Sequence, residues 1–163
     1  MECFPITLED FKRALNNESG FIKKYSCSFS KSPYNSKENF HKIGRKVYEK
    51  AFQDIKNYFW HTPWLIRIKE STEVIRIINF KGPVNNENEV TIGYGIEPKY
   101  RNKGYTSEIV NELIQWIGKK FNILRIIAFV EKNNEKSQKV FKNNNFVKNE
   151  EIDREIIWKY EFQ

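Results

Sequence analysis

Two segments of different periodicity meet at Arg101-Asn102-Lys103-Gly104-Tyr105-Thr106. Residues 90–96 form an apolar run typical of a strand, and residues 105–117 form an amphipathic run typical of a helix. The first N–H groups of a helix have no partner within it, and the helix dipole makes that end positive. A basic, glycine-containing turn that leads into a helix therefore predicts an anion site, and a diphosphate would fit it.

The segments around this turn predict a mixed α/β domain. Upstream, we expect a short helix that is capped near Thr7, carries Leu8, Phe11, Ala14 and Leu15, and ends at Gly20. A polar loop (26–37) and an amphipathic helix (40–59) follow. The remaining expected elements are strands at 64–68, 74–80 and 89–97, a helix at 105–118, a strand at 123–130, a helix at 134–143, and strands at 146–147 and 156–162.

The bulk composition predicts one folded domain over residues 1–163 with an anionic partner. Lys and Arg together number 28 against 21 Asp and Glu, which gives a net charge of +7. Such a charge suits a nucleic acid, an acidic surface or a phosphorylated small molecule, or serves solubility alone. The basic residues are spread among acidic neighbours and form no single stripe, which argues against a nucleic acid.

The sequence predicts a cytoplasmic protein without a metal site. Cys3 and Cys27 are the two cysteines, too few for a disulfide framework and without metal-ligand spacing. The first residues show no signal-peptide pattern, and no apolar run approaches the ~18 residues that cross a membrane. The oligomeric state stays open, with a homodimer as one option.

A second motif follows the strand at 123–130: Asn134-Glu135-Lys136-Ser137, and then Asn145-Phe146. Together with the first motif, it resembles the GNAT superfamily of acyl-CoA N-acetyltransferases. In that family a strand leads into (Gln/Arg)-x-x-Gly-x-(Gly/Ala) and a helix, and the next strand leads into Asn-x-x-Ser and later Gly-Phe. The matching positions here are Arg101, Gly104, Asn134, Ser137 and Phe146. The resemblance is firm over 89–147, looser over 64–83 and weak before residue 60.

This resemblance implies an α+β fold in α/β/α layers, with a mixed, mostly antiparallel twisted sheet whose central strand pair is splayed. It also implies acetyl-CoA as co-substrate, with the diphosphate on the backbone of 102–106 and the pantetheine arm between the strands at 92–97 and 123–130. At Gly104 a Cβ would collide with the phosphates. The residues implied to bind the cofactor are Ile96, Arg101, Asn102, Lys103, Gly104, Tyr105, Thr106, Asn134 and Ser137.

Two of these residues have a second interpretation. Asn134 stands where an ordinary helix N-cap is expected. The resemblance implies in addition that its side chain hydrogen-bonds the pantetheine arm. Ser137 lies one helical turn later on the same side. A lone serine would mean nothing there, but the resemblance implies that it contacts the thioester sulfur or helps to protonate the leaving thiolate.

The positions at which the family often has a general acid and a proton-relaying glutamate carry other residues here. A tyrosine four residues after the serine often serves as general acid, and this position is Phe141. A glutamate ten residues before the Gln/Arg position often relays a proton through water, and this position is Thr91. Glu89 projects from the same strand face and is the substitute candidate, with an exposed strand-end carboxylate as the alternative.

Amine chemistry makes these departures informative. A lysine-like amine has a pKa of ~10.4, so forming its neutral state at pH 7 costs about 4.6 kcal/mol. A base or a desolvating pocket must offset this cost. An α-amino group with a pKa near 8 needs less help. The missing acid and base therefore favour an easily deprotonated amine or a mechanism based on positioning.

The main functional prediction is acetyl transfer from acetyl-CoA to a primary amine of a small molecule or a protein N-terminus. The amine attacks the thioester directly in a ternary complex, and backbone N–H groups near Ile96 polarise the carbonyl. The loop at 26–37 and the helix at 40–59 are expected to shape the acceptor site. The C-terminal half resembles the ribosomal-protein acetyltransferase branch. The alternative is an acyl-CoA-binding module with weakened turnover, which Phe141 and Thr91 favour.

Overall fold

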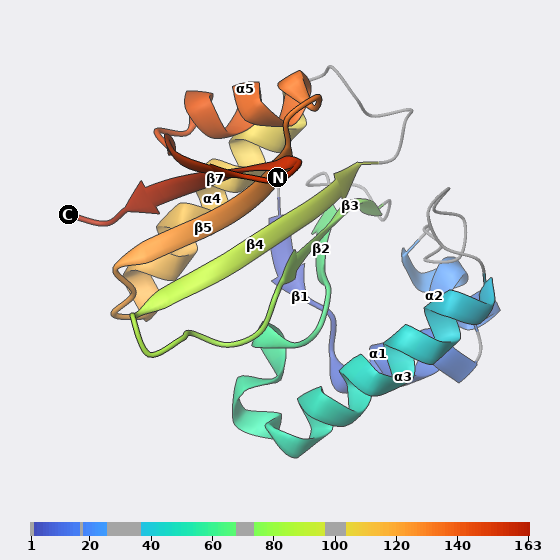
Figure 1. Ribbon diagram of the computed structural model, residues 1–163. Coiled ribbons are helices and arrows are strands. Elements are labelled where there is room, and N and C mark those ends of the chain that lie inside the picture. Colours follow the sequence, from blue (N-terminus) through green and yellow to red (C-terminus); the bar gives the residue numbers. More distant parts are fainter. Residues whose placement is uncertain (1, 17, 26–36, 68–73, 97–103) are drawn as a thin grey trace. The chain divides into compact units, whose positions relative to one another are not determined.

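The computed structural model describes residues 2–16, 18–25, 37–67, 74–96 and 104–163 (Figure 1). The elements are β1 (Glu2–Pro5), α1 (Leu8–Asn16), α2 (Glu18–Tyr25), α3 (Lys37–Gln53), the 3-10 helix η1 (Ile55–Trp60), β2 (Trp64–Arg67), β3 (Val74–Phe80), β4 (Glu89–Ile96), α4 (Tyr105–Lys120), β5 (Arg125–Glu131), α5 (Glu135–Asn143), β6 (Val147–Ile152) and β7 (Glu155–Glu161). None of the described helices is long and apolar enough to cross a membrane.

The strand order is β1-β2-β3-β4-β5-β7-β6 in one seven-stranded sheet. β4 and β5 run parallel, and the other pairs whose register is described are antiparallel. This confirms the predicted mixed, mostly antiparallel sheet. Contacts divide the chain into two compact units, Met1–Asn79 with Tyr94–Lys99, and Phe80–Gly93 with Tyr100–Gln163. The single domain over residues 1–163 stays a prediction.

Two N-terminal elements were missed by the sequence analysis. β1 has four residues and ends in a proline, so its own sequence carries no clear strand signal. Its pairing with β2, from Glu2↔Arg67 to Pro5↔Trp64, stabilises it as a strand. The prediction that Gly20 ends the first helix was wrong, because α1 ends at Asn16 and Gly20 lies in the first turn of α2. A glycine costs a helix roughly 1 kcal/mol relative to alanine, which does not by itself end a helix.

The long amphipathic helix predicted at 40–59 is two helices. α3 ends at Gln53, and Asp54 adopts a non-helical conformation (φ −116°, ψ 59°) before η1 begins. α3 packs closely on α1, since a Cβ added to Gly44 would lie 2.5 Å from Leu15 Cδ2. The apolar core of this unit comprises Ile6, Phe11, Ala14, Leu15, Phe21, Tyr25, Leu65 and Val74.

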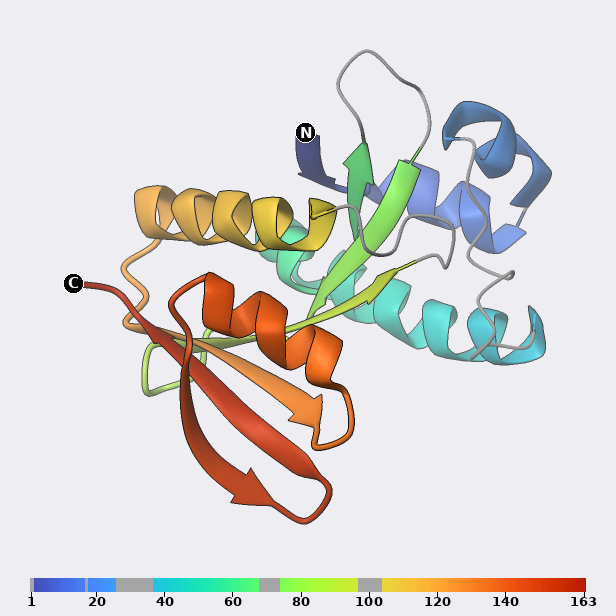
Figure 2. The same ribbon diagram turned by 90° about the horizontal axis from the view of Figure 1, so that it is seen from above.

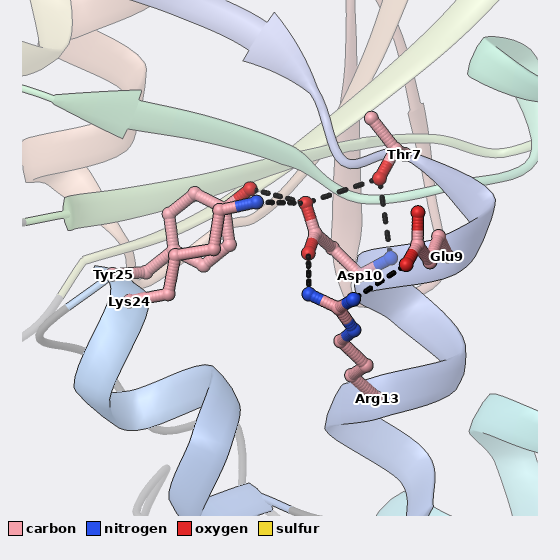
Figure 3. Close-up of polar contacts among 6 residues, drawn as sticks. All are labelled: Thr7, Glu9, Asp10, Arg13, Lys24 and Tyr25. Carbon is pink, nitrogen blue, oxygen red and sulfur yellow. Dashed lines mark hydrogen bonds and ion pairs between the residues drawn. The ribbon is translucent and has the colours of Figure 1, made fainter.

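A buried carboxylate joins α1 and α2 (Figure 3). Asp10 is 4% exposed, and its Oδ2 accepts hydrogen bonds from Lys24 Nζ (2.7 Å), Tyr25 Oη (2.6 Å) and Thr7 Oγ1 (3.0 Å). Thr7 Oγ1 in turn accepts from the Asp10 N–H at 3.1 Å, which confirms the predicted cap near Thr7. Burial acts to raise the pKa of Asp10, but the bonds from Lys24, Tyr25 and Thr7 outweigh it and hold that pKa below its ordinary value.

The second unit has β5 and β7 at its centre. These strands pair over their full length, from Arg125↔Glu161 to Glu131↔Glu155. α4 and α5 contact each other and lie side by side in both views (Figures 1 and 2). α4 also approaches the C-terminal segment, because a Cβ added to Gly118 would lie 2.8 Å from the Phe162 ring.

The parallel pairing of β4 with β5 covers only part of each strand. Its register runs from Glu89↔Arg125 to Ile92↔Ala128. β4 continues to Ile96 and β5 continues to Glu131. The described pairing therefore ends at the position from which the resemblance implies that the two strands separate.

Candidate functional site

Gly104 has a left-handed backbone conformation, which favours glycine. It occupies the N-cap position of α4 with φ 75° and ψ −14°, in the left-handed region. A Cβ added there would meet no described atom within 4 Å. The turn therefore needs glycine for its backbone conformation, and the space beside its Cα is open. The neighbouring predicted residues Arg101, Asn102 and Lys103 lie outside the described residues.

The first turn of α4 presents backbone donors next to this space. The N–H groups of Ser107 and Glu108 donate to Gly104 O, at N···O distances of 3.1 and 3.4 Å. The carbonyls that would serve the N–H groups of Tyr105 and Thr106 precede the helix, so these two amides have no helical acceptor. Thr106 is 7% exposed as a whole residue, so little of it lies at the surface. The helix dipole adds positive potential at the same place.

Asn134 and Ser137 are brought together at the start of α5. Asn134 Oδ1 accepts the Ser137 N–H at 3.1 Å, which confirms the N-cap interpretation. This bond occupies the amide oxygen, so the Asn134 Nδ2 group remains a donor that the cap does not need. Asn134 is exposed and Ser137 is partly exposed. The pair can therefore serve the helix and a ligand at once.

The Asn145-Phe146 match has a structural explanation. Asn145 has φ 62°, the left-handed conformation that ends many helices and that glycine or asparagine adopts most readily. Its N–H donates to Lys142 O at 3.2 Å, and the Phe146 N–H donates to Phe141 O at 3.1 Å. These two bonds define a Schellman motif, and its usual apolar contact is present, with the Phe141 and Phe146 ring centroids 4.8 Å apart.

Phe141 is thus a core residue. Its side chain is 2% exposed and packs against Phe146. The ring helps to fix the end of α5, and it offers no proton donor. Among the described residues, the structure supplies no tyrosine in its place on α5.

Glu89 is the first residue of β4 and contacts Arg125 and Asn85. Its Oε1 lies 2.9 Å from Arg125 Nε, and its Oε2 accepts from Asn85 Nδ2 at 3.2 Å. Its backbone N–H donates to Asn85 Oδ1 at 2.8 Å. Ile96 is seven residues further along the strand, which is about 23 Å at the usual rise. The structure therefore does not bring Glu89 to the end of β4 that carries Ile96, and its role as a base stays a prediction.

One contact between α4 and α5 was not predicted. Asn144 follows α5, is 7% exposed, and its Nδ2 donates to Ser107 Oγ and to Val140 O, both at 2.8 Å. No local sequence pattern indicates this contact, because asparagine is ordinary at a helix end and the partner Ser107 is 37 residues away. The bond to Ser107 ties the end of α5 to the first turn of α4.

Within the described part of the chain, no group of three or more His, Cys, Asp and Glu side chains could hold a metal ion. His61 instead lies 3.2 Å from Asp54 through its Nε2 atom. The described groups of the candidate site are the first amides of α4 and the side chains of Asn134 and Ser137. Such groups bind phosphates and amides by hydrogen bonding.

Comparison with known families agrees with this arrangement. The model of the acetyltransferase (GNAT) domain family matches residues 4–147 of the chain. The match covers most of the sequence and includes both motifs. The protein therefore belongs to the GNAT acetyltransferase family.

Individual relatives are more distant. The chain is 29% identical over 97 residues to the uncharacterized N-acetyltransferase YjdG of Bacillus subtilis, a match over 60% of this chain and 58% of that relative. Its fold is similar to that of a ribosomal-protein-S5-alanine acetyltransferase from Vibrio fischeri (TM-score 0.70, 20% identity, 98% and 91% of the two chains). It is also similar to a spermidine N-acetyltransferase from Vibrio cholerae in complex with CoA and spermine (TM-score 0.64, 15% identity, 97% and 92%). At these identities the solved structures show that the fold is shared. The shared fold includes the N-terminal part of the chain, where the sequence resemblance is weak.

Proposed function

We propose that this protein transfers an acetyl group from acetyl-CoA to a primary amine of a small molecule or a protein N-terminus. The observation that carries the proposal is the left-handed Gly104 turn, which leaves open space beside its Cα and leads into the first amides of α4. The family match supports CoA as the ligand of this turn, because the sequence resemblance implies that this motif binds the CoA diphosphate.

The donor would be held by residues of both motifs. The Tyr105 and Thr106 amides would bind the diphosphate, and the side chains of Arg101, Asn102 and Lys103 would surround it with polar and positive groups. The Asn134 Nδ2 group, which the cap leaves unused, would donate to the pantetheine arm. The proposed binding set is Ile96, Arg101, Asn102, Lys103, Gly104, Tyr105, Thr106, Asn134 and Ser137.

The chemistry would be one displacement in a ternary complex. The amine nitrogen attacks the thioester carbonyl carbon, the C–S bond breaks, and the amine loses one proton. Backbone N–H groups near Ile96 would stabilise the negative charge on the carbonyl oxygen. The Ser137 hydroxyl would meet the departing thiolate and help to supply its proton. Juxtaposition of the two substrates would provide much of the rate enhancement.

Two acceptor classes follow from the neighbours. One is named a ribosomal-protein-alanine acetyltransferase and the other a spermidine N-acetyltransferase. The first name supports a protein N-terminus and the second a polyamine. An α-amino group needs less help with deprotonation than an alkylamine, which suits a site without the usual acid and base. Residues 26–36 of the predicted loop at 26–37 lie outside the described residues, and Lys37 begins α3 instead. The contribution of the loop to the acceptor site, the cytoplasmic location and a homodimer stay predictions.

A CoA-binding module with weakened turnover is the second candidate. It is favoured by the buried, donor-free Phe141 ring and by the pairing of Glu89 with Arg125. The two candidates differ in one measurable step, which is release of the CoA thiol in the presence of an amine. The assay that separates them is thus thiol release from acetyl-CoA across a panel of amines.

Asn134 permits a test in which capping and ligand binding are separated. Asn134→Asp keeps an equally good N-cap, so we expect the Tm to change by no more than about 1–2 °C. It removes the N–H donor, so we expect the KM for acetyl-CoA to rise about five- to tenfold. Asn134→Ala loses both roles and should also lower the Tm by about 2–4 °C, as a cap worth ~1 kcal/mol implies. A wild-type KM for acetyl-CoA in Asn134→Asp would show that Asn134 serves only as a helix cap.

A further inference from the structure

The Nδ2 group of Asn144 donates both of its hydrogens to acceptors. Val140 O is only an acceptor, so the Nδ2 group of Asn144 must face it, and this fixes the orientation of the amide. Its second hydrogen goes to Ser107 Oγ at 2.8 Å. Because Asn144 is 7% exposed, water cannot readily replace either bond.

Ser107 carries this connection on to the Gly104 turn. Its Oγ accepts from Asn144, and its backbone N–H donates to Gly104 O at 3.1 Å. The left-handed turn is thereby linked to the last turn of α5 by consecutive hydrogen bonds. Since Ser107 Oγ accepts the Asn144 bond, its own O–H remains a donor in the same helical turn as the Tyr105 and Thr106 amides.

We propose that Asn144 is a positioning residue for the donor's diphosphate. It acts through Ser107 by holding the first turn of α4, so that the amides after Gly104 keep one arrangement before the ligand arrives. This inference rests on the proposed function, because it assigns a supporting residue to the same site. Oxyanion-binding donors must be held within about 0.5 Å of their working positions, and hydrogen bonds from a supporting shell provide that precision.

The Tyr105 and Thr106 amides that would hold the diphosphate belong to α4, whereas the residue that orders them follows α5. Deleting the side chain of Asn144 should therefore weaken recognition of phosphate and leave the chemical step unchanged. A residue that only stabilised the fold would not distinguish a donor with a diphosphate from one without it. This difference gives the proposal a specific readout.

The test compares Asn144→Ala and Ser107→Ala with Asn143→Ala, an exposed neighbour at the end of α5. Ser107→Ala keeps the bond from Asn144 to Val140 O, so it remains informative if Asn144→Ala folds poorly. With acetyl-CoA we expect the KM to rise about tenfold in both variants, with kcat changed less than twofold. The double variant should be no worse than either single variant, because both changes break one connection. Asn143→Ala should match the wild type.

A donor that lacks the diphosphate provides the second arm. With S-acetylpantetheine, kcat/KM should be equal in the wild type, Asn144→Ala and Ser107→Ala. An equal loss with both donors would overturn the proposal, since it would indicate a general structural role. Unchanged kinetics with acetyl-CoA in both variants would overturn it as well.

Hydrogen exchange in the ligand-free protein tests the connection without any ligand. We expect the amides of Ser107 and Glu108, which donate to Gly104 O, to exchange at least tenfold faster in Asn144→Ala and Ser107→Ala than in Asn143→Ala. Unchanged exchange would refute the proposed ordering. Failure of the proposed function is distinguishable, because it would appear as a wild-type protein that does not bind acetyl-CoA in calorimetry. That result would overturn the positioning role together with the function.

Discussion

Gly104→Ala is expected to weaken acetyl-CoA binding by tenfold or more, which corresponds to about 1.4 kcal/mol. The left-handed backbone at Gly104 disfavours any Cβ, so the ligand-free protein should also lose roughly 1 kcal/mol, or about 2–4 °C in Tm. Acetyl-CoA at 100 times its Kd should raise the wild-type Tm by about 5–10 °C. At the same concentration the variant's rise should be about half as large. Thermal melts and calorimetry measure both quantities.

Gly104→Asn is the matched control. Asparagine tolerates the left-handed region, so this variant should recover most of the lost Tm. Its side chain still fills the space beside Cα, so acetyl-CoA binding should stay weak. Wild-type affinity in both variants would contradict the placement of the diphosphate at this turn. Recovery of affinity in Gly104→Asn alone would show that backbone conformation matters and that the open space does not.

Asp10→Ala is expected to destabilise the N-terminal unit strongly. It removes the acceptor shared by Lys24, Tyr25 and Thr7 and leaves the buried Tyr25 hydroxyl without this partner. The loss should be about 3 kcal/mol, or roughly 6–12 °C in Tm. Lys24 is half-exposed and returns to water, which keeps the loss below that of a fully buried ion pair.

Glu9→Ala provides the comparison on the same helix. Glu9 pairs with Arg13 at the surface, and such pairs contribute at most ~1 kcal/mol. Its Tm should therefore fall by no more than about 2–4 °C. Equal effects of the two substitutions would contradict the role given to Asp10 in joining α1 and α2.

The contribution of Asp10 should also depend on pH. Because the folded-state pKa of Asp10 lies below its ordinary value, its stabilising effect is complete above the unfolded pKa near 3.9. The effect is lost as the pH falls through the lower folded value. The Tm difference between the wild type and Asp10→Ala should thus be constant from pH 7 to 5 and shrink toward pH 3. A difference that grows in acid would contradict this linkage.

Local sequence signals predicted the C-terminal half of the fold better than the N-terminal half. The run at 123–130 and the helix at 105–118 have strong periodicity, and β5 and α4 lie within a few residues of the predicted limits. β1 has four residues and depends on pairing with β2, which a local pattern does not reveal. The break at Asp54 was hidden because the apolar spacing continues from α3 into η1.

In the candidate site, too, residues with a local sequence signal were predicted and a residue that depends on tertiary contacts was not. Gly104 was found because a basic glycine turn before a helix has a local sequence signature, and Asn134 because it stands at a helix-cap position and matches the family motif. Asn144 was missed because its partner Ser107 is brought to it only by the packing of α5 on α4. The sequence indicated only that Phe141 stands where the family often has a general acid. In the structure its ring packs against Phe146 in the Schellman motif that ends α5.

Acetyl transfer itself tests the central claim most directly. Purified protein would be incubated with acetyl-CoA and a panel of polyamines, small amines and peptides with free N-termini, and the free CoA thiol would be measured together with acetylated product by mass spectrometry. We expect one equivalent of thiol per acetylated amine for at least one acceptor class, and a strong reduction with Gly104→Ala. Acetyl-CoA that binds but releases no thiol above the acceptor-free control with any amine would contradict it.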